Sequence, residues 1–496
     1  MSSAESSQVD ELTVTFQPPL YLERRGWVFE IIRREHVRIV LDVGCGEGEL
    51  LSCLSNPAPW LSPPPLSLLA TMFTSDSSTT LSATIATELS TSTEELLHPV
   101  KVMGLDTCAR DLQDAIEGTD PNLDMSWKQP SRWEPLEVQI WEGGLETFNP
   151  EFVGVECILS TEVIEHLPEP VLQAFAPVLL GAYHPRLLLL TTPSYTFNAR
   201  FTAPSAPPGA RSGFRDPTGR TARIFRHHDH RFEWTVAEFA DWCARVADAW
   251  GYDVEVGGVG RPRERDPYGR DEELGYASQV AAFRRREGTE WAARRLEAYE
   301  RFAQGRCSEG LKSTGHKLLA AHRHAADEKA GRPAPLREIG EELARRMGEY
   351  GERTMQVREL WFDDGVAALC GGWIEVLLAA VEAYQDLHLH RSPSEASSDW
   401  KVEFDKIEIK NNGGDRMLWP EQEADEGADG SLSSSASWPE TPELGWDIAG
   451  TCWDIASDDS TRLDVVYQNG KFEELTVDPP QESQGGAPEW NNGWGA

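Results

Sequence analysis

The sequence has few basic residues, no closely paired cysteines and no long apolar run. Lys and Arg number 46 against 82 Asp and Glu, which gives a net charge of −36. A chain this acidic does not coat nucleic acid through its overall charge, because phosphate binding needs dense Lys and Arg. Any contact with nucleic acid therefore depends on a local basic patch.

The cysteines and the apolar residues exclude further classes of protein. None of the eight cysteines forms a CxxC pair, so we predict reduced thiols and neither a disulfide framework nor a zinc site. No apolar run reaches the ~18 residues of a membrane helix. The first residues, "MSSAESSQVDELT", lack the basic and apolar segments of a secretory signal. We therefore expect no membrane partner and an intracellular location, cytoplasmic, nuclear or both.

Composition divides the chain into four parts. Residues 1–13 are polar and are expected to be disordered, and residues 14–286 carry alternating strand and helix patterns. Within the second part, the Ser/Thr/Pro-rich stretch 55–97 predicts a surface insertion with little fixed structure. Residues 287–390 are helical by pattern, and residues 391–496 form an acidic, Trp-containing tail. We expect that tail to be partly disordered, with a small β element.

Strand patterns that alternate with helix patterns predict a doubly wound α/β fold. We expect a mainly parallel, seven-stranded, Rossmann-like sheet with helices on both faces. The last two strands of this part, "YDVEVGGVG" and "ASQVAAFRRR", predict an antiparallel hairpin at the sheet edge. In the extension, "HKLLAAHRHAADEKA" and "LREIGEELARRMGEYGERTMQVRELWF" predict two helices.

A glycine-rich turn, "LDVGCGEG", follows the first predicted strand and supplies Asp42, Gly44, Gly46 and Gly48. Glycines let the backbone approach a ligand closely, and the helix that follows favours a carboxylate at its N-terminus. The glycine spacing differs from the GxGxxG fingerprint of dinucleotide sites. It favours S-adenosylmethionine as cofactor, with a tight structural turn as the alternative.

Two further positions fit the same cofactor. Asp106 ends the second predicted strand, where a carboxylate can accept hydrogen bonds from both ribose hydroxyls. Its large distance from the glycine turn is explained by the insertion at 55–97. Gly144 lies in "EGG" after the third predicted strand. For Asp106 alone, an ordinary cap at a strand end is the alternative.

The stretch "LSTEVIEHLPEP" places two carboxylates and an imidazole directly after the fourth predicted strand. If a helical turn begins at Glu162, then Glu165 and His166 share its face. Carboxylates with imidazole suit Mg²⁺ or Mn²⁺, and the histidine favours Mn²⁺. An exposed helix start with acids at its N-terminus is the alternative.

A histidine cluster, "FRHHDHRFEWT", occupies the loop after the fifth predicted strand. Loops of this kind emerge at the same edge of a doubly wound sheet, where ligands bind. His230 is therefore a candidate fourth metal ligand. His227 and His228 precede it, and a surface position is the alternative for any one of these imidazoles.

Four groups of motifs, in one order across residues 14–286, resemble the Hen-type small-RNA 3′-terminal 2′-O-methyltransferases. They are "FQPPLYLERR"; "LDVGCGEG"; "TEVIEHL" with "LTTPSYTFN"; and "DHRFEWT" followed by "VEVGGVG" and "ASQVAAFRR". The resemblance implies that Glu162, Glu165, His166 and His230 bind a divalent metal. It implies cofactor contacts at Asp42, Gly44, Gly46, Asp106 and Gly144, the last at a position where family members can have serine.

The resemblance also implies a reaction. A methyl group would move from S-adenosylmethionine to the 2′-hydroxyl of the last nucleotide of a small RNA, which protects the RNA. A divalent ion that binds the 2′ and 3′ oxygens would lower the pKa of the 2′-hydroxyl, and His227 or His228 could take the proton. The alternatives are a methyltransferase for another acceptor, such as a small molecule or protein, and a non-catalytic adaptor.

Two other features bear on partners. Arginines gather in residues 211–231, where they could hold RNA or form a solvated loop, and Tyr195 or Phe197 could stack on a base or lie in the core. The arginines are Arg211, Arg215, Arg220, Arg223, Arg226 and Arg231.

Isolated tryptophans of the tail resemble the hooks that bind Argonaute proteins, because several weak sites add by effective concentration. Packing in a small β module with the predicted hairpin at 464–473 is the more common fate of such residues. These tryptophans are Trp438, Trp446, Trp453, Trp490 and Trp494.

Overall fold

The structure, a computed structural model, describes most of the first 406 residues. The described ranges are 12–74, 96–122, 131–207, 210–304, 315–363, 365–392 and 396–406. Within these ranges, none of the helices combines the length and the apolar character that crossing a membrane requires.

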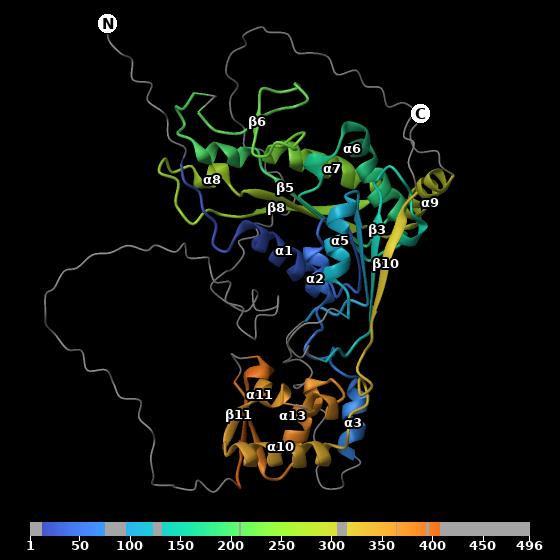
Figure 1. The fold of residues 1–496 in the computed structure, drawn as a ribbon, viewed down its shortest axis with the longest axis vertical. Coiled ribbons are helices and arrows are strands. Elements are labelled where there is room, and N and C mark those ends of the chain that lie inside the picture. The colour runs from blue at the N-terminus through green and yellow to red at the C-terminus, as the bar shows by residue number, and fades with distance from the viewer. Residues whose placement is uncertain are drawn as a thin grey trace, which may run out of the picture.

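An eight-stranded sheet organises the first two thirds of the chain (Figure 1). Its order is β10-β3-β2-β1-β4-β5-β9-β8. The strands are β1 Ile39–Val43, β2 Lys101–Asp106, β3 Leu136–Glu142, β4 Cys157–Thr161, β5 Leu187–Pro193, β8 Tyr252–Val259, β9 Ser278–Arg285 and β10 Lys317–His324. The strands from β3 to β5 pair in parallel, whereas β9 is antiparallel to both β5 and β8. The predicted mainly parallel sheet and the β8–β9 hairpin are therefore confirmed.

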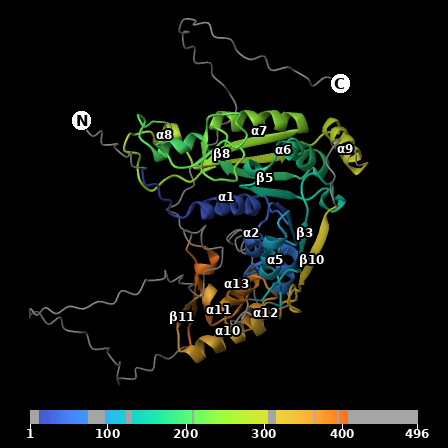
Figure 2. The ribbon, with the colours of Figure 1, turned by 45° about the horizontal axis from the view of Figure 1, so that its top comes forward.

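Helices cover both faces of this sheet, because consecutive residues of a buried strand point to opposite sides. Val40 packs with α1, α2 and α5, and Leu41 packs with α6 and α7 on the other face. Figure 2 shows α7 and α1 on the two sides of the strands. The helices are α1 Leu20–Arg34, α2 Glu49–Ser55, α5 Ala109–Gly118, α6 Glu169–Ala176 and α7 Val236–Trp250.

The eighth strand corrects a prediction. The segment "HKLLAAHRHAADEKA" was expected to be a helix, but Lys317–His324 forms β10, antiparallel to β3. Leu, Ala, Lys and His are adequate helix formers. The open edge of β3 overrides this local preference by offering a ladder of backbone hydrogen bonds, so the sheet has one strand more than the sequence predicts.

A separate hydrophobic core forms what we call the C-terminal module, residues 326–406 as far as they are described (Figure 1). Its helices are α10 Leu336–Tyr350, α11 Val357–Trp361, α12 Val366–Leu369 and α13 Ile374–Ala383. Its three-stranded sheet is made of β11 Thr354–Gln356, β12 Leu387–His390 and β13 Lys401–Phe404. The long helix predicted over 336–362 is divided at Gly351, whose φ of +70° ends α10. The module follows β10 along the chain, and α9 Thr289–Ala303 precedes that strand.

The insertion is more ordered at its start than its composition predicts. Residues 55–74 include the helix α3 Leu66–Thr74, which lies beside α13 of the C-terminal module (Figure 1). Trp60 and Leu69 are buried in the core of that module. The composition rule fails here because a few well-placed apolar residues fix a segment that is otherwise rich in Ser and Pro.

Three indoles of other segments hold the loop that precedes α3. Trp133 and Trp361 each donate a 3.0 Å hydrogen bond to the Pro59 carbonyl, and Trp373 donates one of 3.1 Å to Ser62. These bonds tie the insertion to both the sheet and the module. The tail tryptophans and the hairpin expected at 464–473 lie outside the described residues.

Candidate active site

The glycine turn lies between β1 and α2 and needs glycine at two positions for steric reasons. Gly44 and Gly48 both have φ of +80°, a region that side chains with a Cβ rarely adopt. A Cβ on Gly44 would lie 2.4 Å from Val163, and one on Gly48 would lie 2.8 Å from the Cα of Ala115 in α5. Gly48 therefore permits α2 and α5 to pack, and Gly44 brings the turn close to the segment after β4.

Two carboxylates face the turn. Asp42 is buried, and burial together with the nearby Asp106 charge raises its pKa to about 7. Its Oδ1 has no hydrogen-bond partner among the described residues. Asp106 accepts hydrogen bonds from the Gly46 and Cys108 amides at 2.9 and 2.8 Å. The predicted cofactor residues thus converge at the carboxyl ends of β1 and β2.

A cavity of about 330 Å³ opens above this turn. It is lined by Asp42 and Gly44 from the turn, by Glu162 from the end of β4, and by Arg24 and Arg25 from α1. The two arginines have no role in the sequence prediction, although they stand in the quoted motif "FQPPLYLERR". They bring positive charge to a cavity that otherwise carries acidic groups.

The predicted cofactor residue Gly144 lies just beyond β3, beside the start of β10. His316 shares a 2.9 Å hydrogen bond with the Gly144 carbonyl through its Nε2. A Cβ on the adjacent Gly143 would lie 2.1 Å from the His316 ring. His316, which leads into the unpredicted strand, therefore fixes the loop that carries Gly144, and neither residue is among those that line the cavity above the glycine turn.

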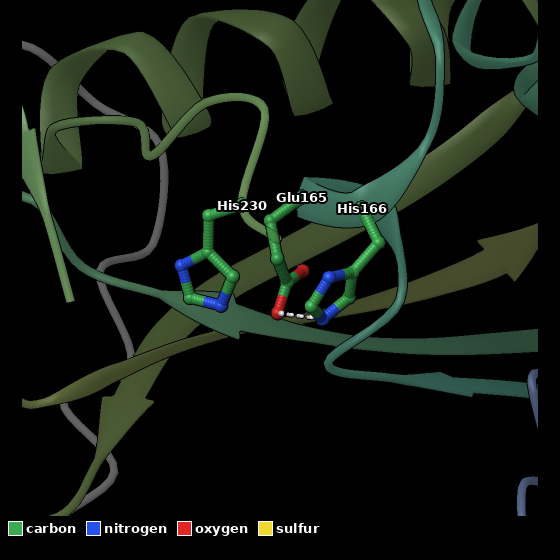
Figure 3. Close-up of side chains that lie close together, drawn as sticks. All are labelled: Glu165, His166 and His230. Atoms are coloured by element: carbon green, nitrogen blue, oxygen red, sulfur yellow. Dashed lines mark ion pairs between the residues drawn. The ribbon is translucent and has the colours of Figure 1, made fainter. Parts of the chain in front are cut away.

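Three of the four predicted metal ligands meet. Glu165, His166 and His230 offer ligand atoms that all lie within 4.8 Å of one another. Figure 3 shows the three side chains converging from two elements, the 3₁₀ turn Ile164–His166 and the loop before α7. Two backbone-directed bonds hold these elements together, because Arg231 donates from its amide to the Glu165 carbonyl and from Nε to the His166 carbonyl.

Glu165 is fully buried and only partly satisfied. Its Oε2 accepts a 2.9 Å hydrogen bond from Thr192, while Oε1 has no hydrogen-bond partner among the described residues and lies 3.9 Å from His166 Nε2. Burial raises the pKa of Glu165 well above its usual range, and the Glu162 charge raises it further. A buried carboxylate oxygen without a partner is costly, and a cation between Glu165 and the imidazoles would satisfy it.

Both imidazoles suit a cation. Burial lowers the pKa of His166, so the ring is neutral near pH 7 and keeps a lone pair for a ligand. His230 is buried, and its Nδ1 lies 2.8 Å from Glu233 Oε1. A carboxylate on one ring nitrogen orients the other toward a metal, as in many metal sites.

Glu233 is a site residue that the sequence prediction missed. Burial acts to raise its pKa, but the hydrogen bond with His230 and the charge of Arg226 outweigh burial, so its pKa lies below the usual value. Asn198 donates a further hydrogen bond of 2.5 Å. A carboxylate three residues after His230 was the available signal in "DHRFEWT".

Glu162 lies outside the three-residue group. Its φ is +56°, and the helical turn begins at Ile164, so the predicted shared helix face does not form. The Glu162 carboxylate accepts a 2.9 Å hydrogen bond from Thr191 and lies 3.5 Å from Arg24. Glu162 lines the cavity above the glycine turn, and it adjoins in sequence two members of the predicted metal-ligand group, Glu165 and His166.

The predicted basic loop is largely occupied by internal contacts. Arg220 pairs with Glu169 at 2.7 Å, and Arg223 pairs with Glu238 at 2.8 Å and lies over the Tyr195 ring at 4.7 Å. Phe197 is buried, so it belongs to the core and does not offer a stacking surface.

These observations define the class of the fold. A mainly parallel sheet whose strands run β3-β2-β1-β4-β5-β9-β8, with β9 reversed and a glycine turn after β1, is that of the class I S-adenosylmethionine-dependent methyltransferases.

Comparisons with known proteins show which methyltransferases the chain is similar to. The chain is 28% identical to the small RNA 2′-O-methyltransferase of Arabidopsis thaliana over 54% of its length, and 26% identical to that of Gallus gallus over 54%. It is 32% identical to that of Xenopus tropicalis over 42%. Over these stretches the chain is similar to small RNA 2′-O-methyltransferases. The matches span 23%, 55% and 53% of those proteins.

Two solved structures align with part of the chain. A crystal structure of the small RNA methyltransferase HEN1 aligns with 63% of the chain and 28% of its own, at 23% identity and a TM-score of 0.40. The methyltransferase domain of a bacterial Hen1 aligns over 54% of the chain and all of its own, 100%, at 25% identity and a TM-score of 0.33. No protein-family model matches the chain.

Proposed function

We propose that this chain transfers a methyl group from S-adenosylmethionine to the 2′-hydroxyl of the 3′-terminal nucleotide of small RNAs, with a divalent cation, Mg²⁺ or Mn²⁺. The observation that carries the proposal is the buried Glu165 Oε1, which lacks a hydrogen-bond partner among the described residues and lies beside two imidazoles. Similarity to small RNA 2′-O-methyltransferases supports the choice of acceptor.

The proposed cation ligands are Glu165, His166 and His230, with Glu162 as the fourth. Glu162 stands next to the group, since its charge acts on the pKa of Glu165. A divalent cation bound there would lower the pKa of the 2′-hydroxyl and favour an RNA whose adjacent 3′-hydroxyl is free.

The cofactor is proposed to occupy the cavity above the glycine turn. Arg24 or Arg25, which line this cavity, would pair with the carboxylate of the methionine part. Asp106, which lies at the end of β2 and outside the lining residues, would accept hydrogen bonds from the ribose hydroxyls. The same cavity reaches Glu162, so the sulfonium and the metal-ligand group would lie on adjoining sides of that residue. Methyl transfer depends mainly on such alignment, because the sulfonium already carries its leaving group.

His227 is proposed as the acceptor of the 2′-hydroxyl proton in preference to His228. Its Nδ1 is hydrogen-bonded to Asp229, and its ring lies 5.6 Å from the His230 ring. A carboxylate that fixes one ring nitrogen leaves the other ready to accept a proton. The His228 ring instead packs on Phe214.

The test is methyl transfer from labelled S-adenosylmethionine to a short RNA, compared with the same RNA blocked at its 3′-hydroxyl. We expect transfer only to the RNA whose 3′-hydroxyl is not blocked. Transfer should be lost when a chelator is present, and it should be lost in the variants Glu162→Ala and His230→Ala. His388→Ala is the matched control, because this exposed histidine lies in the C-terminal module. Undiminished transfer in strong EDTA would show that the reaction needs no divalent cation. Transfer to a small molecule or protein instead of RNA would show that the proposed acceptor is wrong.

Partners and location remain proposals. We propose that the tail tryptophans bind an Argonaute protein and that the chain acts in the cytoplasm, the nucleus or both. Unchanged capture of Argonaute after alanine replacement of all five tryptophans would exclude this contact.

A further inference from the structure

A two-stranded hairpin stands beside the metal-ligand group and carries an exposed aromatic ring. It consists of β6 Phe214–Arg215 and β7 Ile224–Phe225. Phe225 is buried, whereas the Phe214 side chain is 47% exposed. Nothing in the catalytic proposal so far uses Phe214.

The hairpin is held rigidly. Asp216 accepts hydrogen bonds from the Thr218 and Thr221 amides at 2.8 and 2.9 Å, which closes the hairpin loop. The ion pairs of Arg220 with Glu169 and of Arg223 with Glu238 anchor that loop to the starts of α6 and α7. Phe214 is therefore presented on a fixed support, which lowers the entropic cost of binding to it.

A continuous row of rings leads from the metal-ligand group to Phe214. The His230 ring lies 5.6 Å from that of His227, His227 lies 4.6 Å from His228, and His228 lies 5.8 Å from Phe214. His227 and His228 are exposed, as is Arg215 next to Phe214. The row thus combines ring faces with positive charge along a path that starts at the proposed position of the 3′-terminal ribose.

We propose that Phe214 and His228 form a stacking platform for the base of the second or third nucleotide from the RNA 3′ end. This inference rests on the proposed function. Unpaired bases bind proteins by stacking on Phe, Tyr, Trp or His, with little dependence on base identity. The platform would bind the strand just upstream of the reacting nucleotide, while Arg220 and Arg223 of the loop are engaged in internal ion pairs.

The direct test is RNA binding, measured by fluorescence anisotropy with a short 5′-labelled RNA, without cofactor. Phe214→Ala is expected to raise the Kd about five- to 150-fold, the range for loss of one stacked base. Phe214→Trp should restore binding. Phe362→Ala is the matched control, since this phenylalanine is 62% exposed in the C-terminal module.

RNAs that lack one base identify the position. An abasic site at the second or third nucleotide should weaken binding to the wild type, and at that position Phe214→Ala should add no further loss. An equal effect of Phe214→Ala on intact and abasic RNAs, or no effect on either, would overturn the platform.

The outcome also separates this inference from the proposed function. If the wild type methylates RNA and Phe214→Ala binds RNA as well as the wild type does, the platform alone is wrong. If the wild type methylates no RNA, the proposed function is wrong as well. Phe214 is exposed, so its replacement should leave the melting temperature unchanged, and a large fall would attribute the loss to unfolding and count against the platform.

Discussion

The sheet domain and the C-terminal module use their buried residues in different ways. At the carboxyl ends of β1 and β4, the sheet domain buries Asp42 and Glu165, and each keeps an oxygen without a hydrogen-bond partner among the described residues. The module instead is built mainly around apolar side chains such as Trp361 and Leu377, although it also buries the carboxylate of Glu375 in α13. Among the described residues, both groups suited to a metal lie in the sheet domain.

This difference explains why the candidate site of the sheet domain could be predicted from the sequence more fully than the packing of the C-terminal module. Chemistry demands particular residue types at particular spacings, so Glu165, His166 and His230 stand out in the sequence. Packing demands shape and apolar area, which many sequences provide. The hydrogen bond from Trp361 to the Pro59 carbonyl joins residues 302 positions apart, and no local sequence pattern predicts it.

The sharpest test of the contrast is Glu165→Gln. We expect methyl transfer to fall by about a thousand-fold, since a bound metal contributes several kcal/mol to such a reaction. The free energy of unfolding should stay the same or rise, because a buried carboxylate without full hydrogen bonding destabilises the fold. Activity and chemical denaturation of the same preparation measure both. A clear loss of stability would mean that Glu165 supports the fold as the module residues do.

The module should respond in the opposite way. Trp361→Ala removes a buried side chain and its bond to Pro59, and should lower local stability by about 3–5 kcal/mol. The adjacent Phe362→Ala, at an exposed position, should change it by less than about 0.5 kcal/mol. Hydrogen exchange of the α13 amides reports both. Similar protection in the two variants would contradict the packing assigned to Trp361.

The raised pKa of Asp42 predicts that the free energy of unfolding of the sheet domain depends on pH. The pKa of this residue is raised from 3.8 to about 7 in the folded chain, so its contribution to stability is present below pH 3.8 and is lost as the pH rises through about 7. At about 1.4 kcal/mol per pKa unit, the loss is at most on the order of 4 kcal/mol.

The variant Asp42→Asn cannot ionise and should not show this loss. Without cofactor it should be more stable than the wild type at pH 8, and the difference should vanish toward pH 4. Denaturation at several pH values measures it, and a difference that does not change with pH would show that Asp42 is ionised throughout.

The smallest expected effect concerns Glu233, which acts through His230. Glu233→Gln should weaken Mn²⁺ binding by about 10- to 100-fold, because the carboxylate orients the imidazole. Calorimetric titration of the cofactor-free chain measures the affinity. Glu255→Gln, which removes a surface partner of Arg284, serves as control. Equal affinities in the two variants would leave Glu233 without a part in the site.

Sequence reasoning predicted the mainly parallel sheet with its β8–β9 hairpin and the convergence of Glu165, His166 and His230, because strand ends of a doubly wound sheet share one edge. It placed Glu162 on the wrong local structure, since this residue has a left-handed φ of +56° and its amide donates to the Thr191 carbonyl of β5. It also predicted a helix at Lys317–His324, where the free edge of β3 decides the structure. In each case the missing information was a contact between distant segments.

The loop at residues 59–62 has a practical consequence for dividing this protein. A fragment that ended at residue 286, where the methyltransferase motifs stop, would lose β10 and the whole C-terminal module. It would expose Trp60, Leu69 and Trp133 to water and leave the edge of β3 open. Uncovered apolar surface and a bare strand edge both promote aggregation. A fragment that keeps these contacts therefore includes β10 and the C-terminal module, which lie past the last recognisable motif.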